Sequence, residues 1–179
     1  MAQPDFKSSL IAAIPSLRAF AISLTGKKDR ADDLVQETMM KAWASQTSFR
    51  EGTNIKAWLY TILRHEFYAV HRKRKREVED ADGKIAEAVG TLPEQHGVLD
   101  LADMQVALLK LPEEQREALL LVTASDLSYD EAAAVCGVPP GTIKSRVNRA
   151  RVRLSELLQI DDATKFGATP EMIAALTST

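Results

Sequence analysis

Residues 142–151, with the sequence TIKSRVNRAR, combine cationic, amide and hydroxyl side chains in a pattern that could read DNA. Arg and Asn form bidentate hydrogen bonds with base edges in the major groove, while flanking cations approach phosphates. At about 100° per residue, the apolar residues of 143–158 fall within one arc of roughly 100°. Ser145, Asn148 and Arg149 then lie on the opposite face. The cations at its flanks are Lys144, Arg146 and Arg151.

The residues before this segment predict the turn that would position it. Ser128 and Glu131 have the spacing of a capping box, which satisfies free backbone donors at a helix start. Gly137 suits the left-handed residue that ends a helix, and Pro140 suits the first position of the next helix. Together they predict a helix-turn-helix with a basic second helix. A solvated basic helix is the alternative, but the coincidence of turn residues and basic face favours DNA binding.

A second group, rich in carboxylates, lies on a helix that we predict to begin after Asp29. Apolar residues at helical spacing leave an opposite face with Asp32, Asp33, Gln36, Glu37, Met40 and Lys41. Paired carboxylates can perform acid–base catalysis, but no pocket, nucleophile or metal cluster accompanies them, so we predict that the chain is not an enzyme. They either pair with a basic partner surface or form a solvated face near a helix N-terminus.

Composition bounds the remaining possibilities. The 179 residues, 45% of them apolar, can bury one core of ordinary size or two small ones. The net charge of −2 hides a segregation: Lys and Arg outnumber Asp and Glu by 14 to 7 in residues 1–76, whereas residues 77–111 carry 2 against 8. A basic front half suggests a polyanionic partner.

Cysteine, histidine and hydropathy patterns exclude several classes of protein. Cys136 is the only cysteine, so no internal disulfide can form, and the scattered histidines have no metal-site spacing. No signal core or membrane-length apolar run is evident. We therefore expect a soluble cytoplasmic protein with no metal, cofactor, small-molecule substrate or membrane partner.

Hydrophobic periodicity predicts an all-α fold of two small helical domains joined by a flexible acidic linker. In residues 1–76, apolar residues at helical spacing predict one helix that follows Pro15 and stops at Gly26, and then two further helices. The last of these ends in the cationic block HRKRKR. Residues 77–99 lose this periodicity and gain Asp, Glu, Gly and Pro, which favours disorder in the free chain. Residues 100–160 form the domain with the helix-turn-helix, and residues 161–179 form a tail.

The motifs of the first domain resemble region 2 of the extracytoplasmic-function (ECF) sigma factors. DDLVQET at 32–38 with KAW at 41–43 is similar to the segment that grips the clamp coiled coil of RNA polymerase, and AWLYTILR at 57–64 leads into recognition of the −10 element. The resemblance implies core-polymerase contacts by Asp32, Asp33, Leu34, Gln36, Glu37, Met40 and Lys41. It also implies contacts with the downstream element, or with melted DNA, by Phe49, Arg50, Arg64, His65, Arg72, Lys73, Arg74 and Arg76.

The second domain resembles sigma region 4, which reads the −35 element, and the whole resemblance covers about residues 5–160. LPEEQR at 111–116, GTIKSR at 141–146 and RAR at 149–151 carry the similarity. It implies contacts with the upstream element by Thr142, Lys144, Ser145, Arg146, Asn148, Arg149 and Arg151. The partners implied by both regions are core RNA polymerase and promoter DNA.

Aromatic residues leave one question open. A base held out of the melted strand needs a stacking surface, which the loop around Phe49 and Arg50 could supply. Phe49 could equally be an apolar plug for that loop. We expect Trp43 and Trp58 to belong to the core.

EFY at 66–68 with the cationic tail is similar to the general-stress (EcfG-like) subgroup known in alphaproteobacteria. The family often has Asn at the position of His65, so the exact downstream promoter sequence stays open. The subgroup implies control by a small anti-sigma protein, which a response regulator that mimics the sigma factor releases. The flexible linker further predicts an extended free chain, with the partner wedged between the domains.

Two other functions are compatible with part of the sequence. A stand-alone helix-turn-helix repressor or activator would explain residues 137–151 but not the basic front domain. A sigma mimic that only sequesters an anti-sigma protein would not need the basic face of the last helix. A sigma factor explains both regions.

Overall fold

The computed structural model describes residues 5–79 and 101–159, and all of its regular elements are helical. The first half contains α1 (Phe6–Thr25), α2 (Lys28–Ala44), a 3-10 turn η1 (Gln46–Ser48) and α3 (Ile55–Glu79). The second half contains α4 (Leu101–Leu109), α5 (Glu113–Thr123), α6 (Tyr129–Cys136) and α7 (Pro140–Leu158). The all-α prediction is confirmed. The predicted linker falls largely outside the described residues, although α3 runs three residues past the boundary at 76.

The first helix begins earlier than predicted. Asp5 caps α1 by accepting a hydrogen bond from the backbone N–H of Ser8 at 2.6 Å, so the helix starts at Phe6 and includes Pro15 rather than following it. Pro15 weakens the helix locally, but the cap at Asp5 and the apolar stripe of Leu10 and Leu17 on the buried face, which continues through it, outweigh this cost. Gly26, at φ 65°, ends the helix in the left-handed conformation as predicted.

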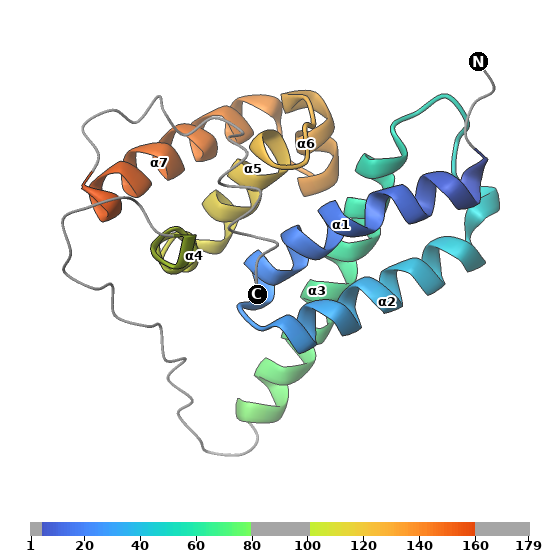
Figure 1. Cartoon of the computed structure of the whole chain (residues 1–179), viewed down its shortest axis with the longest axis horizontal. Coiled ribbons are helices and arrows are strands. Elements are labelled where there is room, and N and C mark those ends of the chain that lie inside the picture. The colour runs from blue at the N-terminus through green and yellow to red at the C-terminus, as the bar shows by residue number, and fades with distance from the viewer. Residues whose placement is uncertain (1–4, 80–100, 160–179) are drawn as a thin grey trace.

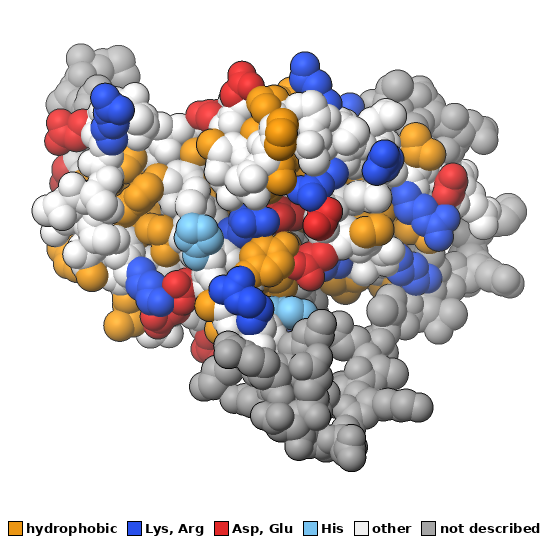
Figure 2. Space-filling model, turned by 180° about the vertical axis from the view of Figure 1, so that it is seen from behind, with side chains coloured by type: hydrophobic (Ala, Val, Ile, Leu, Met, Phe, Trp, Pro, Cys, Tyr) orange, Lys and Arg blue, Asp and Glu red, His pale blue; other side chains and the backbone are white. Residues whose placement is uncertain are grey.

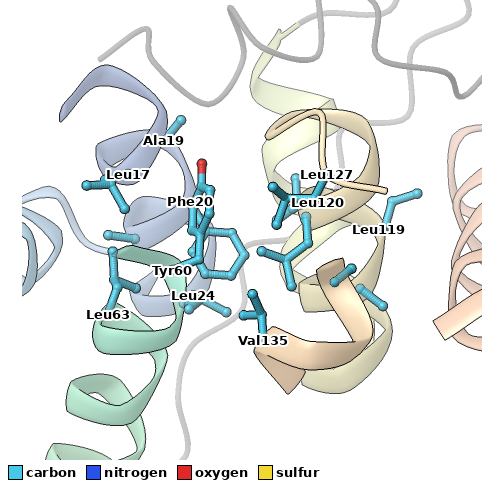
Figure 3. Close-up of a cluster of buried hydrophobic side chains, with 14 of the residues drawn as sticks. Leu17, Ala19, Phe20, Leu24, Tyr60, Leu63, Leu119, Leu120, Leu127 and Val135 are labelled. Atoms are coloured by element: carbon cyan, nitrogen blue, oxygen red, sulfur yellow. The ribbon is translucent and has the colours of Figure 1, made fainter. Parts of the chain in front are cut away.

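The two halves pack directly against each other. In Figure 1, α1 to α3 form one layer and α4 to α7 the other, and α3 contacts α6 while α1 contacts α4 and α5. Phe20 and Tyr60 face Leu120, Leu127 and Val135 across this boundary (Figure 3). All five side chains are buried, so the halves share one hydrophobic core.

This packing contradicts the prediction of an extended chain. The sequence indicates which residues are apolar but not how much apolar surface each half leaves uncovered after its own helices have packed. Tyr60 and Leu120 have no exposed surface at all. Separating the halves would return such side chains to water, at roughly 25 cal/mol for each Å² of apolar area.

Helix α1 is long and apolar enough, by length and composition alone, to cross a membrane. Here its apolar stripe is instead part of the core: Leu17, Phe20 and Leu24 are buried. It packs against α2, α3, α4 and α5.

Candidate nucleic-acid and protein interfaces

The helix-turn-helix forms as predicted. The hydroxyl of Ser128 accepts from the backbone N–H of Glu131 at 3.2 Å, and the Glu131 carboxylate accepts from the backbone N–H of Ser128 at 2.8 Å. Gly137 ends α6 at φ 67°, and α7 starts with Pro140. The buried face of α7 consists of Ile143, Val147, Ala150 and Leu154.

The outer face of α7 presents most of the predicted reading residues. Lys144, Ser145, Asn148 and Arg149 are exposed, whereas Thr142, Arg146 and Arg151 are partly buried. The Lys144 ammonium lies 5.8 Å from the centroid of the Tyr129 ring, a cation–π distance. This face therefore places amide and cationic groups together on one solvent-facing surface.

Arg146 differs from its neighbours because it is already paired. Its guanidinium donates to the Glu114 carboxylate at 2.6 Å, and only 16% of its side chain is exposed. The pair joins α7 to α5, so Arg146 stabilises the orientation of the reading helix in this structure. The sequence interpretation assigned no role to Glu114 or to Tyr129.

The predicted polymerase-binding face of α2 is only partly available. Asp33, Gln36, Glu37, Met40 and Lys41 are exposed, but Leu34 is buried in the core and supports the face from within. Asp32 is held by Arg18 of α1 through two hydrogen bonds of 2.5 and 3.0 Å. This pairing lowers the pKa of the Asp32 carboxyl.

Lys41 is likewise engaged within the first half. Its ammonium lies 2.6 Å from a Glu66 carboxylate oxygen and 3.5 Å from Glu37, and the Glu66 contact raises the pKa of Lys41. Asp33 and Glu37 are exposed on this face, and Glu37 makes the longer of the two Lys41 contacts. Glu66 belongs to the EFY segment, so that segment orients a residue of α2.

The tryptophans and Phe49 form an aromatic cluster with Phe6. Phe49 has its ring centroid 5.8 Å from Phe6 and 5.3 Å from Trp58, and Trp43 lies 6.5 Å from Phe6. Phe49 is thus the plug that anchors the loop, which leaves Arg50 exposed beside it. Trp58 packs against the core as predicted, but the prediction for Trp43 is wrong, because its position on the last turn of α2 leaves 51% of it exposed.

The cationic side chains of α3 surround a shallow cavity of about 290 Å³, lined by Arg64, His65, Tyr68 and Arg72. His65 and Arg72 are exposed. Figure 2 shows that basic and acidic side chains lie next to each other on the face it displays, rather than forming one uninterrupted basic surface. Lys73, Arg74 and Arg76 belong to the end of α3, where their side chains lie outside the described part of the chain.

Arg64 reaches across the boundary between the halves. Its Nε donates to Oε1 of Glu117 on α5 at 2.6 Å, and its guanidinium carbon lies 4.7 Å from the centroid of the Tyr68 ring. The Glu117 side chain has no exposed surface. Sequence reasoning missed Glu117, although its spacing from the buried Leu120 and Leu121 could have revealed a carboxylate on the apolar face.

Comparison with known proteins places these two halves in one family. Residues 10–77 match the family model "Sigma-70 region 2" and residues 101–154 match "Sigma-70, region 4". The chain is 57% identical over 163 residues to the ECF RNA polymerase sigma factor EcfG of Rhodopseudomonas palustris, covering 91% of this chain and 90% of that protein. It is 37% identical to the ECF RNA polymerase sigma factor SigC of Mycobacterium tuberculosis, over 75% of this chain and 73% of SigC.

A solved structure is similar across both halves. The sigma factor RpoE from Bartonella quintana, co-crystallised with the anti-sigma factor NepR, has a TM-score of 0.80 and 59% identity, covering 88% of this chain and 99% of RpoE. Both sigma regions thus occur in the predicted order, and the match spans 90% of EcfG and 99% of RpoE. The chain belongs to the ECF RNA polymerase sigma factors.

Proposed function

We propose that this ECF sigma factor binds core RNA polymerase through the exposed face of α2, reads the −35 element with α7, and engages the −10 element with α3 and the loop before it. Binding core polymerase and directing initiation at specific promoters is the function of the family to which the chain belongs. The observation that carries the residue assignment is the exposure of Lys144, Asn148 and Arg149 on one face of a helix-turn-helix.

Within this proposal the side chains have different tasks. Asp33, Glu37 and Met40 supply charge and apolar contact to polymerase, while Leu34, Asp32 and Lys41 hold the α2 face in shape. Arg50 is the exposed polar group of the melting loop, with Phe49 as its anchor. The cations of α3, namely Arg64, Arg72, Lys73, Arg74 and Arg76, contact the DNA backbone, which supplies salt-dependent affinity rather than base choice. His65 contacts the same downstream element.

Regulation is the second part of the proposal. We infer that a small anti-sigma protein holds this chain inactive in the cytoplasm and that its promoters belong to stress-response genes. Support comes from the 59% identity to a sigma factor co-crystallised with an anti-sigma factor and from the 57% identity to an EcfG protein. The EFY segment and the cationic tail that follows it agree with the same subgroup.

Gel-shift and run-off transcription on one promoter template test the proposal against its two alternatives. The sigma factor should shift promoter DNA and start transcripts only together with core polymerase. A repressor or activator would bind its operator without polymerase, and a mimic would bind an anti-sigma protein but no promoter. Asp33→Lys with Glu37→Lys should weaken core binding in a pull-down, and Lys7→Glu on the exposed start of α1 is a charge-change control.

A further inference from the structure

Two polar contacts join the halves at the edge of their shared core. Arg64 donates to Glu117 at 2.6 Å, and the side-chain amide of Asn54 donates to Glu131 at 2.7 Å. Asn54 and Arg64 belong to the start and middle of the α3 region, whereas Glu117 and Glu131 belong to α5 and α6. In both contacts the second half supplies a carboxylate and the first half supplies the donor.

The Glu117 contact is buried and therefore depends on its partner. The Glu117 side chain is inaccessible to solvent and that of Arg64 is 21% exposed. The hydroxyl of Tyr68 lies 3.5 Å from the other Glu117 oxygen. Burial raises the pKa of Glu117, and the Arg64 charge opposes that shift. A buried carboxylate that loses its cation remains uncompensated, which is strongly unfavourable.

The packed arrangement cannot read both promoter elements at once. Elements named for positions −35 and −10 are separated by about 25 base pairs, or roughly 85 Å at 3.4 Å per base pair. A compact globule of this length has a radius of gyration of roughly 16 Å, hence a diameter of about 40 Å. The halves must therefore separate before α3 and α7 can occupy their elements on the same straight DNA.

We propose that Glu117 and Glu131 act as an intramolecular latch that occupies Arg64 and Asn54 in the packed chain, and that promoter DNA replaces the Glu117 carboxylate on Arg64 when the chain opens. The proposal rests on the function proposed above, in which Arg64 contacts DNA. A phosphate and a carboxylate make the same charge-assisted hydrogen bonds to a guanidinium, so one side chain can serve both partners in turn.

The likeness to the RpoE–NepR complex supports this inference. RpoE matches the present structure at TM-score 0.80 over 88% of the chain, which is more than either half contains. A relative held by an anti-sigma protein thus has a similar two-half arrangement. In the present chain, the latch contacts join the two halves in a similar arrangement, and no anti-sigma protein is needed to form them.

Distance measurements on the full chain test the latch directly. Spin labels at Lys28→Cys on α2 and Arg153→Cys on α7, in a Cys136→Ser background, report the separation of the halves, since both positions are exposed. The parent should show mainly the short distance. Glu117→Gln with Glu131→Gln should raise the ratio of open to closed chains by about tenfold or more, because the charge-assisted hydrogen bonds become neutral ones without a change in side-chain shape. An unchanged distance distribution overturns the latch.

A matched control removes an ion pair that lies within the second half. Glu114→Gln breaks the 2.6 Å contact with Arg146 and should leave the distance distribution as in the parent. If Glu114→Gln opens the chain as much as the latch variant does, the effect reflects general charge loss, and the assignment to Glu117 and Glu131 fails.

Arg64→Gln separates the latch from the DNA role. If both hold, this variant opens the free chain and also weakens run-off transcription with core polymerase. If the chain opens but transcription is unchanged, the latch stands and Arg64 is not a promoter contact. If transcription falls while the distance distribution stays closed, Arg64 contacts DNA and the latch is wrong.

Discussion

Helices α7 and α3 carry similar numbers of predicted DNA contacts, but their cationic side chains are in different states. On α7, Lys144, Asn148 and Arg149 are exposed and turned away from the core. On α3, Arg64 is bound to a buried carboxylate of the other half. A basic side chain that the sequence places on a polar helix face can therefore already be bound within the protein. The pairing of Arg64 depends on an element distant in sequence, α5.

Phe20→Ala should have the largest effect on stability. It tests whether the two halves fold together or independently. Phe20 is buried and packs edge-to-face with Tyr60 at 5.0 Å beside the second half. We expect a loss of about 3–5 kcal/mol in the free energy of unfolding, with both halves unfolding in one transition.

Chemical denaturation followed by circular dichroism and by amide exchange in α7 measures this effect. Ile11→Ala on the same helix is the control, since Ile11 is 56% exposed and its loss should cost no more than about 0.5 kcal/mol. Two separate transitions, with α7 unaffected by the Phe20 substitution, would show that the shared core contributes little.

Arg149→Ala and Arg72→Ala should sharpen the contrast between base reading and backbone contact. Arg149→Ala should lose about 1–3 kcal/mol of discrimination at one base pair of the upstream element. Arg72→Ala should weaken binding to all sequences and flatten its salt dependence. Competition binding of the holoenzyme to a set of single-base promoter variants, at two salt concentrations, distinguishes them. A uniform loss for both variants would mean that α7 contacts only the backbone.

Glu117 also predicts a pH dependence of stability. Because burial raises its pKa above the ordinary value of 4.5, the folded chain binds more protons than the unfolded chain between these two pKa values. This contribution is fully present below the unfolded pKa and is lost as the pH rises through the folded pKa. The stability of the parent should therefore increase relative to Glu117→Gln as the pH falls from 7.5 toward 5.

Urea unfolding of the two proteins across this range gives the difference, whose slope cannot exceed about 1.4 kcal/mol per pH unit for one group. Asn148→Ala, at an exposed side chain that does not titrate, is the control and should keep a constant difference from the parent. A constant difference for Glu117→Gln as well would mean that its carboxyl keeps an ordinary pKa.

The smallest effects are expected on the α2 face. Replacing Asp33 alone by Asn should weaken core-polymerase binding by roughly 0.2–1 kcal/mol, as exposed ion pairs contribute little singly. Asp32→Asn should instead act on the fold, because Asp32 is bound by Arg18. Surface plasmon resonance with core polymerase compares the two. A larger binding loss for Asp32→Asn, without a change in stability, would place Asp32 in the interface after all.

Local chemistry made much of this molecule predictable. The capping box at Ser128, the left-handed Gly137 and the spacing of Ile143, Val147 and Ala150 depend on neighbours within a few residues, and each appears in the structure. The start of α1 was misjudged because Pro15 weakens a helix locally, whereas Asp5 and the continuing apolar stripe outweigh it.

The features that sequence reasoning missed all depend on long-range packing. Glu117 contacts Arg64 across 53 residues, and Asn54 contacts Glu131 across 77. No periodicity within one helix specifies such partners. The exposure of Trp43 has a similar cause, since its position at the end of α2 allows only one side of the ring to meet a neighbour.

The aromatic cluster has a practical consequence for spectroscopy. Trp43 and Trp58 are the two tryptophans of the chain, and both lie beside the loop that Phe49 anchors. Intrinsic tryptophan emission excited near 295 nm therefore reports on that loop and on the end of α2. A spectral change on adding polymerase or single-stranded promoter DNA would locate binding there without any label, while events confined to α7 would leave the emission unchanged.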